Sequence, residues 1–178
     1  YCGTLTPEQL VAELPLTEGM RPSNSPFIQE KKTYDKPTVF FLPNSDVQQA
    51  DLYFYINGQP YDIASDVYSD AFNQYFSGGF SGIVLNEIRT KRSMAYTASG
   101  NMLRGALPGK NASFMGYIGT QSDKVVDAID VFMSLLDSMP EYPERIESVK
   151  AALLQYAQIS KPDFRSKSDT YDGWREMG

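Results

Sequence analysis

The sequence predicts a mixed α/β (α+β) domain in which helices pack on one face of a mainly antiparallel sheet. From residue 38 onward, the hydrophobic pattern runs strand, strand, helix, helix, strand, strand, helix, helix, an order typical of this class. The chain has 178 residues, of which 42% are hydrophobic, so it is long enough and apolar enough to bury a core.

The N-terminal part carries a strong helix start followed by a connector. Thr6 can cap a helix whose first residue is Pro7, and both residue types favour these positions. Residues 15–37 are rich in Pro, Ser, Asn and charge and show no periodicity, which is typical of a connector. We therefore expect a short element at 1–14, a connector at 15–37 and the main domain at 38–178.

Two runs after the connector have strand character. Residues 38–43 and 50–58 are dense in β-branched and aromatic side chains, which favour strands. In the second run, one face carries Leu52, Phe54 and Ile56, and the other carries Tyr53 and Tyr55. We expect Tyr53, Tyr55 and Tyr61 to face outward, where they could contact a peptide.

Helical spacing follows at residues 63–76, where two adjacent apolar rows predict a largely buried helix. The rows are Ile63, Val67, Ala71 and Tyr75, and Tyr68, Phe72 and Phe76. A second helix is expected at 81–92, with Phe80, Val84 and Ile88 on its apolar face. In this helix Glu87 and Lys91 are spaced to pair on the outside.

The second half of the chain repeats the alternation of strands and helices. Strands at 96–105 and 112–120 flank the turn-rich stretch GALPGKN, which predicts a hairpin. Residues 123–138 have the clearest helical period. Another helix is expected around 146–156, stopped before Pro162, and a short one is expected to use Phe164, Tyr171 and Trp174.

Composition excludes several classes of function. The formal charge of -6 and the pI near 4.7 argue against nucleic acid, which requires clustered Lys and Arg. No apolar run reaches the roughly 18 residues of a membrane span, and no signal peptide pattern is present. We therefore expect a soluble chain without a membrane partner, and its first residue, Tyr1, suggests a piece of something longer.

The absence of histidine restricts the chemistry further. It excludes Ser/His/Asp and Cys/His catalysis and every zinc site that uses imidazole. The single cysteine, Cys2, cannot form a disulfide within the chain. A cation site made only of carboxylates would need Asp and Glu in a ligand spacing, and here they are scattered. We therefore expect no metal ligands in this chain.

Arg89 and Tyr96 lie where the helical pattern ends and the strand pattern begins. A guanidinium offers five donors in a fixed fork for carbonyl or carboxylate oxygens, and a phenol can donate its proton to an oxyanion or a peptide carbonyl. Together they would form an oxygen-binding pair. The alternative is that Arg89 forms a surface ion pair with Glu87 or another acid and Tyr96 packs at a strand end, and spacing alone favours this alternative.

Two stretches of the sequence resemble the insulinase/pitrilysin family of zinc metallopeptidases. FNQYFSGGFSGIVLNEIRTKRSMAY, residues 72–96, resembles the family segment in which a buried helix, a glycine turn and an LxxEIRxxxxxAY-like helix precede a strand. YCGTLTPEQLVAEL, residues 1–14, resembles the strand end and helix that close one family domain before the next begins.

The resemblance implies a division of labour between two halves that enclose a peptide. One half carries the inverted zinc motif, two His and a Glu on a helix, which binds zinc and activates water. The other half lacks the motif and contributes an Arg and a Tyr that bind the substrate backbone near the scissile bond, and Arg89 and Tyr96 fall on those positions. The helix expected at 63–76 reads DVYSDAFNQYF where ligands would stand, so the resemblance implies the C-terminal, non-zinc half.

The same resemblance implies a peptide substrate and a partner half that holds the zinc. Domains of this family normally continue with additional strands beyond the last helix, so the resemblance implies that the domain at 38–178 is incomplete and that these strands either follow residue 178 or come from another chain. Separately from the resemblance, a first edge strand at 48–58 could pair with an extended substrate. The alternative class is a catalytically inactive relative that acts as a binding or scaffold subunit. Fold alone does not decide between them.

Overall fold

A computed structural model describes residues 1, 3–14, 32–105 and 107–177. Contacts group residues 31–160 into one compact unit and residues 1–30 with 161–178 into another. The larger unit holds the sheet and the candidate site. The division expected from the sequence, at 1–14, 15–37 and 38–178, stays a prediction, and residues 15–31 of its connector lie outside the described residues.

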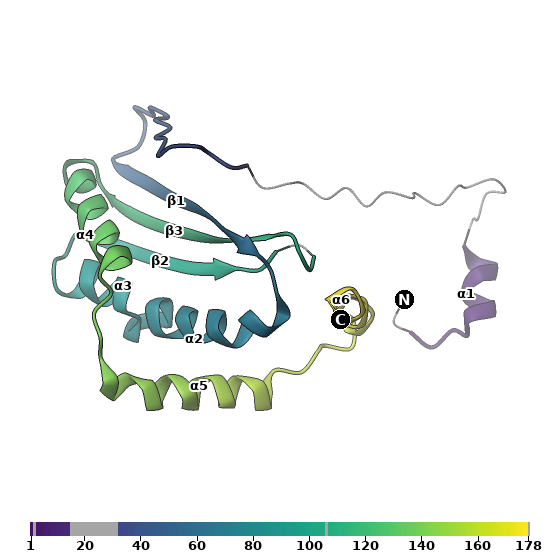
Figure 1. The fold of residues 1–178 in the computed structure, drawn as a ribbon. Coiled ribbons are helices and arrows are strands. Elements are labelled where there is room, and N and C mark those ends of the chain that lie inside the picture. The colour runs from purple at the N-terminus through teal and green to yellow at the C-terminus, as the bar shows by residue number, and fades with distance from the viewer. Residues whose placement is uncertain (2, 15–31, 106, 178) are drawn as a thin grey trace. The chain divides into compact units, whose positions relative to one another are not determined.

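The larger unit contains a three-stranded antiparallel sheet with the order β1-β3-β2 (Figure 1). Its strands are β1 (Gln49–Pro60), β2 (Ala95–Leu103) and β3 (Asn111–Gln121). The predicted hairpin of β2 and β3 is confirmed, with Ala98 opposite Ile118. On the other side of β3, Phe54 of β1 lies opposite Gly116. β1 therefore lies at an edge, and strand addition there stays a prediction.

The helices of this unit lie on one face of the sheet, as the sequence predicts (Figure 1). They are α2 (Asp66–Ser77), preceded by a 3-10 turn at Ile63–Ser65, α3 (Ile83–Leu85), which continues into a π-helix at Asn86–Thr90, α4 (Val125–Asp137) and α5 (Ile146–Ile159). Further 3-10 turns are Gly79–Ser81, Ser122–Lys124 and Pro143–Arg145. The α+β class is thus confirmed, with α5 packed against α2.

The other unit contributes two helices, α1 (Pro7–Glu13) and α6 (Lys167–Met177). The predicted start of α1 is confirmed. Thr6 accepts a hydrogen bond from the backbone N–H of Gln9, and the Gln9 side chain accepts one from the backbone N–H of Thr6. This reciprocal capping box satisfies two N–H groups that the first turn would otherwise leave unpaired.

Aromatic rings fill the space between the sheet and the helices. The ring of Phe132 on α4 stacks on that of Phe54, with 4.3 Å between their centroids, and lies 6.2 Å from the ring of Phe76. Gly116 lets the Phe132 ring approach the sheet, because a Cβ at that position would lie 2.5 Å from it. This close approach is why β3 carries a glycine at its centre.

α2 covers the outer edge of β2 through two side chains. The Asn73 amide donates to the carbonyl of Met102 and accepts from its N–H, at 3.0 and 2.7 Å. The Ser77 hydroxyl makes the same two bonds with Gly100, at 2.7 and 2.6 Å. These side chains satisfy backbone groups that an edge strand would otherwise leave open.

The prediction of a strand at 38–43 is wrong, because these residues have no regular structure. The side chains of Val39 and Leu42 are 91% and 89% exposed. A run of β-branched and aromatic residues forms a strand only when another strand supplies its hydrogen bonds and covers its side chains. In the part of the chain that the structure describes, no strand pairs with residues 38–43.

Several burial expectations are also wrong. In α2, Phe76 is buried, but Val67 and Tyr68 are 71% and 78% exposed, because the helix covers the sheet with one side only. Phe80 is 82% exposed rather than part of the core. Tyr61 is buried and donates to the carboxylate of Asp66, whereas Tyr53 and Tyr55 do face outward.

Candidate functional site

The structure brings the two predicted site residues together. The Arg89 guanidinium lies over the ring of Tyr96, 4.5 Å from its centroid, and 5.5 Å from the centroid of Phe80. Arg89 is half-buried and Tyr96 is 76% exposed. A guanidinium over an aromatic face is held by the ring quadrupole, so the pair is ordered and still open to solvent.

Three irregularities of the backbone make this meeting geometrically possible. Arg89 lies on the π-helix Asn86–Thr90, whose wider turn changes the direction in which its side chains point. Ser93 has a φ of 50°, a left-handed conformation that ends the helix. Tyr96 is the extra residue of a β-bulge, between Ala95 and Thr97, and a bulge re-aims its side chain.

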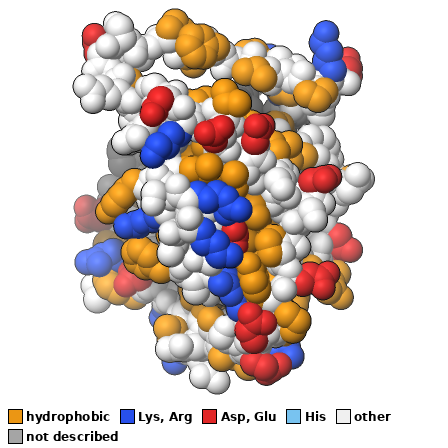
Figure 2. Space-filling model, turned by 90° about the vertical axis from the view of Figure 1, so that its left-hand side faces the viewer, with side chains coloured by type: hydrophobic (Ala, Val, Ile, Leu, Met, Phe, Trp, Pro, Cys, Tyr) orange, Lys and Arg blue, Asp and Glu red, His pale blue; other side chains and the backbone are white. Residues whose placement is uncertain are grey.

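Tyr96 also borders a shallow pocket of about 280 Å³ at the end of the sheet. Its wall is formed where β1 and β2 begin and β3 ends, including Gln48, Gln49, Gly119 and Gln121. Amide side chains and strand ends give this wall hydrogen-bonding groups of both kinds. Arg and Lys side chains gather among hydrophobic ones on the face that carries α3 and α4 (Figure 2).

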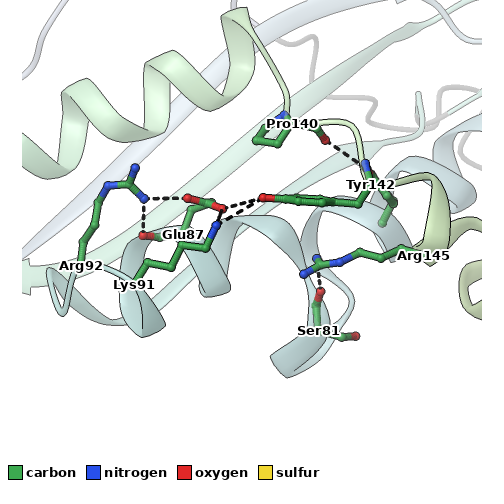
Figure 3. A network of polar contacts seen from close by, with 8 residues as sticks. Ser81, Glu87, Lys91, Arg92, Pro140, Tyr142 and Arg145 are labelled. Atoms are coloured by element: carbon green, nitrogen blue, oxygen red, sulfur yellow. Dashed lines mark hydrogen bonds and ion pairs between the residues drawn. The ribbon is translucent and has the colours of Figure 1, made fainter.

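Sequence reasoning missed the surroundings of Glu87. Its predicted pairing with Lys91 is confirmed, at 2.6 Å between Nζ and Oε1, but its place on the outside is wrong, because Glu87 is only 5% exposed. Arg92 binds the other carboxylate oxygen at 2.7 Å, and the Tyr142 hydroxyl donates to Oε1 at 3.1 Å (Figure 3). Glu87 therefore pairs with these groups and not, as the alternative supposed, with Arg89.

Burial raises the pKa of Glu87, but hydrogen bonds from Lys91, Arg92 and Tyr142 lower it by more, so the pKa lies below its ordinary value. A carboxyl group with a lowered pKa in the folded state stabilises the fold at pH values above its unfolded pKa. This stabilisation is lost as the pH falls through the lowered, folded-state pKa.

We therefore expect the stability difference between the natural chain and Glu87→Gln to depend on pH. The difference in free energy of unfolding should be greatest near neutral pH and should shrink in acid, because the glutamine cannot titrate. Urea unfolding of both proteins across this range measures it. Glu147→Gln is the matched control, since it breaks an exposed pair with Lys150. A difference that stayed constant with pH would contradict the ionised, paired state of Glu87.

The residues that the structure describes offer no metal site. They contain no group of three or more His, Cys, Asp or Glu that could hold a metal ion, and the sequence has no histidine. Within the residues that the structure describes, no group of side chains therefore fits a zinc ion. Among the described helices, none has the length and apolar character needed to cross a bilayer.

Comparison with known proteins identifies the family. The profile of the family described as "Peptidase M16 inactive domain" matches residues 1–153, which is most of the chain. The chain belongs to this M16 inactive-domain family. The membership confirms the resemblance to the C-terminal, non-zinc half of the insulinase family.

The M16 inactive domain of this chain is similar to a crystal structure of a peptidase M16 inactive domain from Pseudomonas fluorescens, with 23% identity and a TM-score of 0.48. The match covers 65% of this chain and 27% of the other, so this chain spans only part of that protein's length. No curated protein matches the sequence.

Proposed function

We propose that this M16 inactive domain is the substrate-binding, non-zinc half of a zinc metalloendopeptidase that degrades or processes peptides. Arg89 and Tyr96 bind the substrate backbone near the scissile bond. The observation that carries the proposal is the exposed stack of the Arg89 guanidinium on the Tyr96 ring. In this proposal residues 1–14 close a preceding domain, 15–37 connect it, and 38–178 form the substrate-binding domain.

The stack suits peptide binding because it fixes the donors before the peptide arrives. A guanidinium stacked on a ring still presents its N–H groups at the edge of its plane. The phenol oxygen of Tyr96 stands at the rim of an exposed ring and can donate to a carbonyl oxygen. Since neither side chain must be reorganised on binding, less conformational entropy is lost than with two free side chains.

Each residue has its own role in this proposal. Arg89 holds a peptide carbonyl beside the scissile bond and keeps the extended backbone in register. Tyr96 donates a hydrogen bond to the carbonyl oxygen that gains negative charge during cleavage. The zinc and its activated water belong to the partner half, and this chain contributes orientation and charge stabilisation.

The competing function is that of a catalytically inactive relative that serves as a binding or scaffold subunit. The observation that favours it is the long, exposed apolar side chains at 39–42, since exposed apolar surface marks contacts with other chains. Such a subunit would bind partners but would not need the Arg89–Tyr96 pair to be accessible.

Peptide hydrolysis distinguishes the two functions. The protein that contains this chain, together with its zinc-bearing half, is expected to cleave a quenched fluorescent peptide, and a chelator should abolish the cleavage. Restoring zinc should restore it, which separates metal removal from damage by the chelator. An assembly that binds zinc and stays folded but never cleaves peptides would favour the scaffold and contradict the proposed peptidase role.

A further inference from the structure

The π-helix that carries Arg89 also carries the buried Glu87, which the proposed binding of peptide does not use. Within this turn the backbone N–H of Lys91 donates to the carbonyl of Asn86 at 3.0 Å, five residues back. A π-turn is rare and persists where surrounding contacts hold it. The hydrogen bonds and ion pairs of Glu87 stabilise the turn in this way.

The Glu87 carboxylate fastens the turn to the residues that follow it. Oε1 accepts from Lys91 and Oε2 accepts from Arg92, at 2.6 and 2.7 Å. The same Arg92 nitrogen also donates to the main-chain carbonyl of Glu87 at 2.9 Å. One buried carboxylate therefore links the π-turn that carries Arg89 to the two residues that follow it, Lys91 and Arg92.

Tyr142 fastens the same carboxylate to the loop between α4 and α5 (Figure 3). Its hydroxyl donates to Glu87, and its backbone N–H donates to the hydroxyl of Tyr75 on α2 at 2.7 Å. The Arg145 guanidinium stacks on the Tyr142 ring at 4.5 Å and donates to the carbonyl of Ser81. This loop, distant in sequence, therefore contacts the π-turn through Glu87 and the turn before α3 through Ser81.

We propose that Glu87 is a positioning residue. By fixing the π-turn that carries Arg89, it directs the Arg89 side chain toward Tyr96. Arg89 lies two residues beyond Glu87 and directs its guanidinium to the ring of Tyr96 and not to the carboxylate. The expected consequence of this positioning, weaker peptide binding when Glu87 is replaced, rests on the proposed function. The geometry itself is testable without any peptide.

The charge and the two oxygens of Glu87 are both needed for this role. A glutamine has the same shape but offers one acceptor oxygen and an NH₂ group. That NH₂ would face Arg92, or Lys91 together with Tyr142, and the Lys91 and Arg92 groups can only donate hydrogen bonds. A buried donor that meets another donor has no partner and is costly, so the turn should loosen.

NMR of the Arg89 side chain tests the positioning role directly. The ring current of an aromatic side chain moves the chemical shifts of protons stacked on it upfield. The variant Tyr96→Leu gives the reference chemical shifts of the Arg89 side-chain protons in the absence of the Tyr96 ring. We expect Glu87→Gln to lose most of the upfield shift while the fold is retained by circular dichroism. Glu147→Gln, which removes an exposed carboxylate on α5, should retain the shift.

A second variant covers the case in which Glu87→Gln does not fold. Arg92→Met replaces a side chain that is 41% exposed and removes both of its bonds to Glu87, so it should fold and lose much of the shift. A full upfield shift in either folded variant would overturn the positioning role. Loss of the shift with unchanged peptide KM and kcat would instead contradict the proposed function and leave the positioning role standing.

Discussion

Replacing Tyr96 with phenylalanine is expected to lower peptide turnover by about one to three orders of magnitude, as removal of an oxyanion donor often does. The variant keeps the ring on which the Arg89 guanidinium stacks and removes only the hydroxyl. Tyr96 is 76% exposed, so the loss of its oxygen should leave stability unchanged. Steady-state hydrolysis of a peptide by the assembled peptidase measures the effect.

The pattern of the kinetic constants identifies the role of the hydroxyl. If it stabilises charge that develops only in the transition state, kcat and kcat/KM should fall by the same factor. If it stabilises the bound substrate and the transition state equally, KM should rise while kcat stays the same. Tyr68→Phe, on an equally exposed tyrosine of α2, is the matched control. Unchanged turnover in Tyr96→Phe would remove this residue from the mechanism.

The elements that sequence reasoning placed well are those with a strong local pattern. The helix expected at 123–138 is α4, Val125–Asp137, because its apolar residues follow the helical period closely. The strands expected at 96–105 and 112–120 are β2 and β3, because a turn-rich stretch separates two runs of strand character. In these segments local preference and tertiary packing agree.

The errors arise where burial depends on a neighbour that the sequence does not reveal. Residues 38–43 have strand character, but a strand needs a neighbouring strand to pair with, and no described strand pairs with these residues. Tyr68 and Phe80 keep a helical spacing with buried residues and are nevertheless 78% and 82% exposed. Periodicity shows which residues share a face and does not show what covers that face.

The candidate site was predictable in its residues and not in its geometry. The types and order of Arg89 and Tyr96, with the family resemblance, were enough to select them. Their meeting depends on a π-turn and a bulge, which leave no clear signal in the sequence. The spacing of Glu87 and Lys91 predicted a pair, but Tyr142 lies far away in the sequence, so nothing indicated that Glu87 is buried.

The largest effect on stability is expected from Phe132→Ala, which should lower the free energy of unfolding by about 3–5 kcal/mol. Phe132 is fully buried and lies against the rings of Phe54, Phe76 and Phe114. Removing its ring takes apolar surface from the core and leaves a cavity over Gly116, whose missing Cβ cannot fill it. Urea unfolding followed by circular dichroism measures the loss.

Val126→Ala on the same helix is the control that separates burial of the ring from helix propensity. Val126 is 68% exposed, and an exposed substitution of this kind usually changes stability by less than about 0.5 kcal/mol. Because domains are stable by only about 5–15 kcal/mol, the Phe132 variant should lie close to unfolding while the Val126 variant should not. Equal losses in the two variants would mean that the rings around Phe132 do not form the centre of the core. In that case the packing that holds α4 on the sheet would have to come from elsewhere.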